Sequence, residues 1–505
     1  MWPRMILTES LQESEDLRLD VKPGDVIDEI TQRVYVRLFI FFLALLSAYL
    51  LYASNPDFSY RASILQKKNI KENETRSNPT GFQCYIEDWN KVQNNQVPFE
   101  DLHRQWVKEN ASRRDNILGS EVRLLTAFAY ESSISVTTTS QRSFGEKAIC
   151  RYFDCNQEEI PSSAYPSFFF PMNVVQCPRR IGAKYMSISS NSTETPQQPI
   201  PLMFRAYPAP MHEISVCVGP MYGDEKKWLE VAEFVEHYKL LGVRHFYFTI
   251  FNMNEYSRKM MDEYQRTGEV ELTVIQSEYQ NVDWQFHLLQ ISECHQRAKY
   301  HSKWVINVDV DERLIMLNGT LQEIVRGYND SVSEIAFAMQ RVQKTAYLPE
   351  KYVSDEQIIK EMEFLKYNLS SEVTWAAYKS MYRPDRTGAM YYHWSYKRYP
   401  GNVVEYVKAE KALVRHYRTI EDKGLGTGWV KHYGNFTVVP TETKFAEKLK
   451  ENVLKKVKYV YDQRILNCEE IPEAAYKEYI NFGHELFHCK FRNDTGSSTG
   501  EPELS

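Results

Sequence analysis

Lys303–Leu317 reads Lys-Trp-Val-Ile-Asn-Val-Asp-Val-Asp-Glu-Arg-Leu-Ile-Met-Leu. Its first half is mostly apolar, which predicts a buried strand, and three carboxylates follow within four residues, at Asp309, Asp311 and Glu312. In an extended chain, Asp309 and Asp311 point to the same side. Two carboxylates on one side of a strand end suit a divalent cation that also binds phosphate oxygens. The alternative is an ordinary strand end whose acidic residues face water.

Chain length and charge limit the classes of protein to which this chain can belong. A chain of 505 residues predicts two or three domains. The formal net charge of -6 gives no basic surface, so we expect no nucleic acid partner. The eight cysteines contain no Cys-x-x-Cys pair, and their even number is compatible with disulfide bonds in an oxidising compartment. They are Cys84, Cys150, Cys155, Cys177, Cys217, Cys294, Cys468 and Cys489.

Residues 34–53 predict a transmembrane anchor. They are almost wholly apolar, and their single charged residue, Arg37, lies near one end, where it can reach the membrane interface. A helix needs about 20 residues to cross a bilayer. Arg33 and Arg37 favour an amino terminus in the cytosol. We therefore expect a cytosolic tail at residues 1–33, a single-pass type II membrane topology and a stem at residues 54–80.

All Asn-x-Ser/Thr glycosylation sequons follow this apolar span. Their placement predicts a glycoprotein whose body is lumenal. The short anchor fits the thinner internal membranes, so we expect the Golgi or another membrane of the secretory pathway. The sequon asparagines are Asn73, Asn110, Asn191, Asn318, Asn329, Asn368, Asn435 and Asn493.

Residues 81–192 predict a small β-rich domain. Strand-like runs alternate there with segments rich in Gly, Pro, Ser and Asn. Four cysteines in this part predict disulfide bonds, although spacing alone does not pair them. Residues 193–211 are rich in proline and predict a linker. The expected strands are Glu121–Tyr130, Ser132–Thr138, Lys147–Phe153 and Phe168–Val175.

Strands and helices alternate from residue 212 onward. This alternation predicts an α/β fold with a doubly wound, mostly parallel sheet. Ligands of such sheets bind at the carboxyl ends of the strands, where Asp309 is expected. The expected strands are Ile214–Val218, His245–Phe251, Val270–Ile275 and the run before Asp309, and the expected helices are Glu225–Leu241, Glu255–Arg266 and Asp283–Tyr300.

The chain beyond Glu312 predicts a helix at Leu321–Tyr328 and a basic amphipathic helix at Lys444–Lys458. Residues 466–505 predict a C-terminal segment and tail. Further strands are expected at Glu334–Val342, Trp375–Tyr382 and Gly388–Trp394.

An ordered set of motifs accompanies this pattern. In chain order they are Trp228–Val243, His245-Phe246-Tyr247-Phe248, Lys303-Trp304-Val305, Asp309-Val310-Asp311-Glu312, Lys379-Ser380, Arg383-Pro384, His393 and His416-Tyr417-Arg418. The set resembles glycosyltransferase family 92 over roughly residues 212–465. The strand-helix alternation that leads to Asp-x-Asp also resembles the GT-A fold of nucleotide-sugar-dependent glycosyltransferases.

This resemblance implies transfer of galactose from UDP-galactose, with inversion, onto a glycan acceptor of a glycoprotein or glycolipid. It also implies Mn2+ or another divalent cation, bound at the Asp-x-Asp (DxD) motif. The chain departs from the family at Phe248–Asn252, where members often carry Tyr-Asp-Asn. An acidic contact to the uridine is therefore not expected there, and Asn252 is the candidate at this strand end.

The resemblance also suggests metal and diphosphate ligands. Asp311 is the first choice as a direct metal ligand, and Asp309 is expected to contact the metal or the ribose. His416 and His393 match the late histidine ligand of GT-A enzymes, or else are packed core residues. Lys379 and Arg383 can hold diphosphate oxygens, or else are ordinary charges at a strand edge.

Inversion requires a general base that takes the proton of the acceptor hydroxyl. Glu312 is one candidate, and it can instead orient the acidic turn. Spacing does not choose among the carboxylates that follow, and each can be an ordinary surface residue. Glu233, within the apolar stripe of its helix, is expected to have a structural role. The other base candidates are Glu361, Glu363, Glu372 and Asp385.

Two rival classes share part of the pattern. A phosphatase of the haloacid dehalogenase type also places Asp-x-Asp after an apolar run, but on the first strand of its domain, with Thr following. Here three expected strands precede the motif, and Glu312 and Arg313 follow it. The second rival is a non-catalytic, glycosylated ectodomain that uses the fold for adhesion or as a scaffold. A chain that binds no UDP in the presence of manganese would favour this second rival over an enzyme.

Overall fold

A computed structural model describes residues 84–109, 122–139, 143–223, 225–275, 284–419, 435–440 and 444–462. The expected tail, anchor and stem lie outside these ranges, as does the segment 466–505. One compact unit begins at Cys84. Among the described residues, no helix combines the length and the apolar character that crossing a membrane requires.

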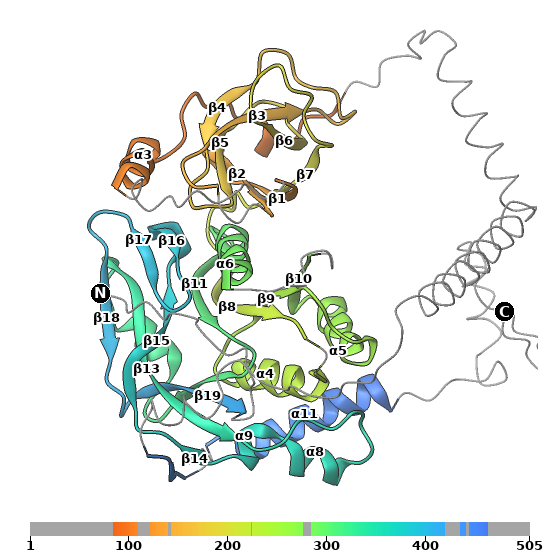
Figure 1. Ribbon diagram of the computed structural model, residues 1–505, viewed down its shortest axis with the longest axis vertical. Helices are drawn as coiled ribbons and strands as arrows, with labels where there is room; N and C mark the ends of the chain where they lie inside the picture. Colours follow the sequence, from red (N-terminus) through yellow and green to blue (C-terminus); the bar gives the residue numbers. More distant parts are fainter. Residues whose placement is uncertain are drawn as a thin grey trace, which may run out of the picture. The chain divides into compact units, whose positions relative to one another are not determined.

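Seven strands form the sheet of the N-terminal part (Figure 1), in the order β4-β3-β6-β7-β1-β2-β5. Strand β7 lies inside the stretch expected as a linker, so that stretch contributes to the sheet. The elements are η1 (Asp88–Asn90), α3 (Glu100–Glu109), β1 (Leu124–Ala129), β2 (Ser133–Thr138), β3 (Lys147–Phe153), β4 (Tyr165–Phe168), β5 (Val174–Pro178), β6 (Tyr185–Ser189) and β7 (Ile200–Phe204).

The single strand expected at Phe168–Val175 is wrong. Two strands, β4 and β5, occupy this stretch and a turn separates them. The N–H of Val174 donates to the carbonyl of Pro171 at 3.0 Å and closes the turn. Proline has no N–H to donate to a strand ladder, so an apolar run that contains Pro171 does not continue as one strand.

Three disulfide bonds link described cysteines. Cys84–Cys155 and Cys150–Cys177 lie in the N-terminal part. The third, Cys217–Cys294, joins β8 (His212–Met221) to α6 (Trp284–Ala298) in the second half of the chain. It therefore fixes a helix directly on a central strand.

The larger sheet begins with four parallel strands in the order β10-β9-β8-β11. Helices connect them in sequence, so the expected α/β fold with a parallel sheet is confirmed (Figure 1). Besides β8 and α6, the elements are α4 (Trp228–Leu240), β9 (His245–Ile250), α5 (Glu255–Arg266), β10 (Val270–Val274) and β11 (Ser302–Val308).

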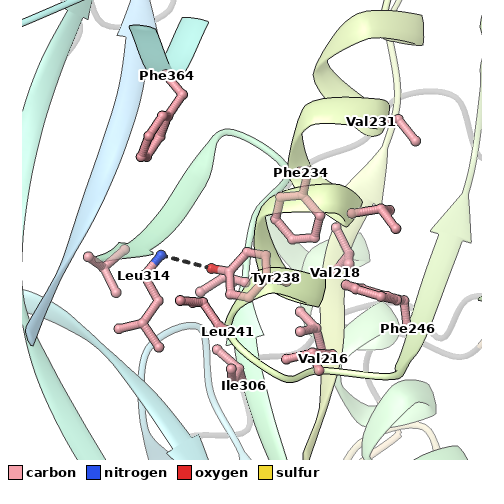
Figure 2. Close-up of a cluster of buried hydrophobic side chains, with 14 of the residues drawn as sticks. Val216, Val218, Val231, Phe234, Tyr238, Leu241, Phe246, Ile306, Leu314 and Phe364 are labelled. Atoms are coloured by element: carbon pink, nitrogen blue, oxygen red, sulfur yellow. Dashed lines mark hydrogen bonds between the residues drawn. The ribbon is translucent and has the colours of Figure 1, made fainter. Parts of the chain in front are cut away.

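Helices cover both faces of these parallel strands. Val216 and Val218 of β8 pack with Phe234 of α4 in the main apolar core (Figure 2), whereas Cys217 points to the other face and bonds α6. This alternation follows from the two-residue period of a strand. The hydroxyl of Tyr238 accepts a hydrogen bond from the Leu314 N–H at 3.1 Å, which ties α4 to the strand that follows the acidic turn.

Beyond β11 the sheet becomes mixed. Strand β15 pairs antiparallel with β11 and with β13, and β12 pairs antiparallel with β19. The strand expected at Gly388–Trp394 ends earlier, at Met390. The elements are β12 (Glu312–Met316), α7 (Leu321–Arg326), β13 (Val332–Lys344), α8 (Asp355–Glu361), α9 (Glu363–Lys366), β14 (Leu369–Ser370), β15 (Thr374–Tyr382), η4 (Pro384–Arg386), β16 (Thr387–Met390), β17 (Ser395–Arg398), β18 (Val403–Val407), β19 (Ala412–Thr419), β20 (Thr437–Val438) and α11 (Ala446–Tyr461).

Helix α3 of the N-terminal part docks on the β16–β17 hairpin. Trp106 packs with Tyr399 in a small apolar cluster, and the His103 ring lies 3.2 Å from the Tyr399 hydroxyl through Nε2. Gly388 leaves room for Trp106, because a Cβ there would lie 2.5 Å from the indole ring. The α3 docking contact therefore depends on close packing between two distant stretches of chain.

Candidate active site

The acidic stretch forms the turn between β11 and β12. The Glu312 N–H donates to the Asp309 carbonyl at 3.0 Å, and the Asp309 N–H donates to Glu312 Oε2 at 2.8 Å. Glu312 is buried and holds the turn. The side chains of Asp309 and Asp311 are 30% and 27% exposed. The turn therefore presents two carboxylates to solvent and keeps the third for its own structure.

Gly219 of β8 gives Asp309 its space. Strands β8 and β11 are neighbours, and Gly219 follows the residue that pairs with Val308. A Cβ at position 219 would lie 2.0 Å from Asp309 Oδ1. The carboxylate position thus depends on a missing side chain in the adjacent strand.

Lys379 of β15 neutralises part of the acidic turn. Its Nζ lies 3.2 Å from Asp309 Oδ2 and 2.9 Å from Glu312 Oε2, and its side chain is buried. Burial alone lowers the pKa of a lysine, but Asp309 and Glu312 outweigh it and raise the pKa of Lys379. The ammonium group therefore stays charged beside Asp309.

His416 of β19 lies against Asp311. Register places His416 opposite Glu312, and its Nε2 is 3.1 Å from Asp311 Oδ2. Burial raises the pKa of Asp311, but His416, with smaller contributions from Lys344 and Arg418, holds it well below its usual range. Asp311 is therefore ionised and has a ring nitrogen beside it.

Two more histidines approach Asp309. His287, in the first turn of α6, places Nε2 at 3.4 Å from Asp309 Oδ1. Burial lowers the pKa of His393 to about 3, and Lys379 acts in the same direction. Burial also lowers the pKa of His287. Sequence analysis missed His287. The signal was available, because a helix that follows a parallel strand begins at the ligand-binding edge of the sheet.

A second group of polar side chains surrounds Asp311. Lys344 forms ion pairs with Glu363 and, at 3.6 Å, with Glu230. Burial lowers the pKa of Lys227, but Glu230, Glu225 and Asp311 outweigh it and raise this pKa. Burial raises the pKa of Tyr222, and both aspartates act in the same direction. Sequence analysis did not identify these residues, because their elements meet only in the folded chain.

The donors at this turn are of the chemical kinds that hard divalent cations bind. Asp309 and Asp311 offer partly exposed carboxylate oxygens, and His416 adds an imidazole nitrogen next to Asp311. Oxygen ligands with an occasional imidazole are typical of Mn2+ sites. Lys379 offsets part of the charge of Asp309 but does not contact Asp311 in the ion pairs of the described residues. Asp311 therefore has His416, rather than Lys379, as its neighbouring group.

The sequence profile of glycosyltransferase family 92 matches residues 212–465, half of the chain. The chain belongs to glycosyltransferase family 92. The match begins at the first residue of β8 and includes the whole acidic turn and, among the described residues, Lys379, His416 and His287, which contact it. Membership in family 92 makes the chain a glycosyltransferase and implies a nucleotide sugar and an acceptor as its substrates.

Some solved structures are remotely similar to this family 92 member. TarS 1–349 of S. aureus is 11% identical over 53% of this chain and 78% of that chain, with a TM-score of 0.22. The iron-containing dodecameric glycosyltransferase TibC of enterotoxigenic E. coli is 9% identical over 32% and 36%, with a TM-score of 0.12. Among curated proteins, no match was found.

Two of the residues expected at the family 92 site lie elsewhere. Strand β15 pairs Ser380 with Asn307 and Tyr382 with Val305, so it runs from the acidic turn toward the amino end of β11. Arg383 follows this far end and pairs with Asp330 and Asp385. Arg383 and Asp385 are therefore not brought to the acidic turn, because Arg383 lies four positions beyond Lys379 in the extended chain.

The other base candidates also have contacts of their own. Glu361 pairs with Lys366, and Glu363 is buried against Lys344. Glu372 is exposed, and within the described part of the chain its side chain forms no ion pair with the acidic turn.

Glu233 has the structural role expected for it. Its carboxylate accepts hydrogen bonds from the N–H groups of Glu363 at 3.0 Å and Phe364 at 2.7 Å. Burial raises its pKa to about 7. Glu233 of α4 therefore caps the start of α9.

Asn252 follows β9 at the carboxyl edge of the parallel strands. Its N–H donates to the Met221 carbonyl at 3.2 Å. The structure thus brings Asn252 to the same edge of the sheet as Gly219, with contacts to β8 rather than to the acidic turn.

A cluster of three histidines lies at the opposite edge of the sheet. Ring nitrogens of His212, His245 and His301 lie within 4.8 Å of one another, which is compatible with a metal ion. Arg205 and Arg297 pair with the adjacent Glu271, so positive charge is already present there. The acidic turn is the better match to the cation expected for a family 92 enzyme.

Proposed function

We propose that the chain is a metal-dependent hexosyltransferase of the GT-A type that uses a UDP-sugar, with galactose as the transferred sugar and inversion at its anomeric carbon. The observation that carries the proposal is the pair of partly exposed carboxylates, Asp309 and Asp311, at the carboxyl end of β11. Ligands of parallel sheets bind at this edge. The galactose, the inversion and the preference for Mn2+ come from the resemblance to family 92 members.

Asp309, Asp311 and His416 would hold the cation. A divalent cation there would neutralise charge that grows on the departing UDP. The chain's own Lys379 supplies a fixed positive charge beside Asp309. His287 and His393 are kept neutral by burial, so they can accept or donate single hydrogen bonds without adding charge.

The carboxylates around Asp311 support the site rather than take the acceptor proton. Glu230 and Glu363 are buried and share Lys344. Glu312 is buried, and its oxygens contact the Asp309 N–H, Lys379 and His416. A carboxylate held in this way lacks access to an acceptor hydroxyl, so the proposal assigns these three to positioning and charge balance.

We further propose that the enzyme is a type II glycoprotein of a secretory-pathway membrane, such as the Golgi, anchored by residues 34–53. Three disulfide bonds among the described residues support an oxidising compartment. The sequon asparagines that the structure describes are all exposed, as glycosylation requires. They are Asn191, Asn318, Asn329, Asn368 and Asn435.

Release of UDP by the purified full-length chain tests the enzyme proposal. The assay uses UDP-galactose, UDP-glucose, UDP-N-acetylglucosamine and UDP-N-acetylgalactosamine, each with Mn2+ or with a chelator. We expect turnover of one donor with Mn2+ and a loss of at least about 100-fold in Asp311→Ala, because a charged ligand is removed. The galactose assignment stands only if UDP-galactose is the donor that is consumed.

Asp262→Ala is the matched control. Asp262 also carries an ion pair, with Arg258 at 2.6 Å, but it lies on the surface of α5. Its removal is expected to leave turnover unchanged. Failure of the wild-type chain to bind or cleave any of the four donors would overturn the proposal and favour the non-catalytic ectodomain.

A further inference from the structure

Aromatic side chains form a continuous series beside the acidic turn. Trp375 and Tyr378 of β15 and Tyr406 of β18 contact one another, with ring centroids 5.4–6.4 Å apart. Tyr378 also contacts Trp394, at 5.3 Å, and Trp394 contacts Tyr391 at 5.9 Å. We call these five residues the aromatic series.

The aromatic series is not part of an apolar core. Trp375 is 42% exposed and Tyr406 is 55% exposed, and the other three rings are half-buried. None of the five belongs to the buried apolar clusters of the described residues. Clustered, solvent-facing aromatic rings of this kind are typical of binding surfaces.

The inner end of the series reaches the active site. Tyr391 contacts Tyr392, whose ring lies 4.9 Å from that of His287. His287 in turn lies 3.4 Å from Asp309 Oδ1. The same strand β15 that carries Trp375 also carries Lys379 into the acidic turn. The rings therefore lead outward from the place where the donor is proposed to bind.

The surroundings of the series favour an uncharged ligand. Burial raises the pKa of Tyr378, Glu334 acts in the same direction and Arg398 in the opposite one. Glu334 and Arg398 pair with each other at 3.0 Å. Their charges therefore largely cancel. A phosphorylated or strongly acidic ligand would find no surplus of positive charge from this pair.

We propose that the aromatic series is the acceptor-binding surface and that it takes a neutral oligosaccharide. The inference rests on the proposed transferase function and extends it. One face of a pyranose ring presents C–H groups with partial positive charge, and the face of an aromatic ring is negative, so the two stack. Several rings in succession bind a chain of sugars and direct its end toward Asp309.

Glycan binding and donor binding by the full-length chain test the inference separately. The probe is a printed panel of neutral oligosaccharides that end in galactose, fucose, mannose or N-acetylglucosamine. We expect binding to at least one of them, weakened about 3- to 10-fold by Trp375→Ala and by Tyr406→Ala. UDP affinity with Mn2+ is measured for the same variants.

Tyr459→Ala is the matched control, because Tyr459 is an aromatic residue of similar exposure on α11, at 51%. It is expected to bind glycans as the wild type does. Unchanged glycan binding in both series variants would overturn the inference, as would absence of binding to the whole panel. A parallel loss of UDP affinity would also overturn it, since the rings would then serve the donor site or the fold.

The two proposals fail in different ways. If the chain binds glycans through the series but binds no UDP-sugar, glycan binding by the series stands, and the transferase proposal and the acceptor role fail. If UDP-sugars are consumed with Mn2+ while Trp375→Ala and Tyr406→Ala transfer sugar to the bound glycan as the wild type does, the transferase stands and the acceptor surface fails.

Discussion

Gly219 and Asp309 form a pair in which one residue contributes by being small. The Asp309 carboxylate occupies the volume that a side chain at position 219 would need. One of its oxygens pairs with Lys379, and the other lies beside the His287 ring. A displacement of this carboxylate would therefore disturb three residues of the site at once.

We expect Gly219→Ala to lower kcat/KM for the donor by about 100-fold, because a misplacement of about 1 Å at a reacting site has an effect of this size. The measurement is steady-state kinetics, with thermal unfolding as a check that the chain is folded. Gly388→Ala serves as comparison, since its Cβ would meet Trp106 and should lower the melting temperature instead. Normal activity in Gly219→Ala would show that Asp309 tolerates displacement.

Residue-level prediction from sequence depended on local pattern and on family resemblance. The Asp-x-Asp motif could be chosen because short-range sequence marks it, Lys379 was chosen because it matches a family motif, and both lie at the acidic turn. Arg383 was chosen by the same logic but lies at the other end of β11, because its position depends on the direction in which β15 pairs. That pairing joins strands about 70 residues apart, and no local sequence pattern indicates it.

At the scale of elements, α9 depends on a residue of another helix. It has only four residues, and the Glu233 carboxylate of α4 accepts from its first two N–H groups. Such a short helix is not stable by itself. Glu233 therefore sets where α9 begins and, through Glu363, where the partner of Lys344 lies.

We expect Glu233→Ala to lower the free energy of unfolding by roughly 2–5 kcal/mol, because two buried N–H groups lose their acceptor. Glu233→Gln keeps one amide oxygen as acceptor and should lose less. Urea denaturation of the two variants and the wild type measures the difference. Equal stability of all three proteins would mean that water or another group replaces the cap.

The alternation of strands and helices was predictable because each element carries its own period of apolar residues. Helix α5 has the expected bounds, and β9 and β10 end one residue earlier than expected. Strand β12 was not expected, since its first two residues, Glu312 and Arg313, are charged and directly follow the acidic stretch. The turn at Asp309–Asp311 is visible only once both strands have partners.

At the scale of the whole molecule, α3 joins the N-terminal sheet to the family 92 domain through a buried histidine. His103 is enclosed by Trp106, Phe170 and Tyr399. Burial lowers its pKa to about 3, with Lys299 acting in the same direction. Protonation of His103 is therefore unfavourable in the folded chain but not in the unfolded one.

This difference gives a pH dependence with a definite sign. The folded pKa lies below the unfolded value of 6.5, so the contribution of His103 is complete above pH 6.5 and is lost as pH falls toward 3. The loss is at most about 1.4 kcal/mol per pH unit. His103→Gln removes this pH-dependent contribution to the free energy of unfolding. The stability difference between wild type and variant should therefore become smaller when the pH is lowered from 7 to 5.

Urea unfolding at both pH values measures that difference. The other buried histidines are present in both proteins, so their contributions cancel. A difference that stays constant with pH would show that His103 is protonated with an ordinary pKa or is already solvated.

The positions of the cysteines also limit the order in which the disulfide bonds can form during biosynthesis. Every cysteine of the two N-terminal bonds has been translated by residue 177, whereas Cys217 must wait for Cys294, 77 positions later. Domains generally fold from the amino terminus as the chain emerges from the ribosome. The N-terminal sheet can therefore be oxidised while Cys217 is still a free thiol, and an early error in pairing would involve Cys217. A chaperone or isomerase that shields this single cysteine during synthesis would raise the yield of active enzyme.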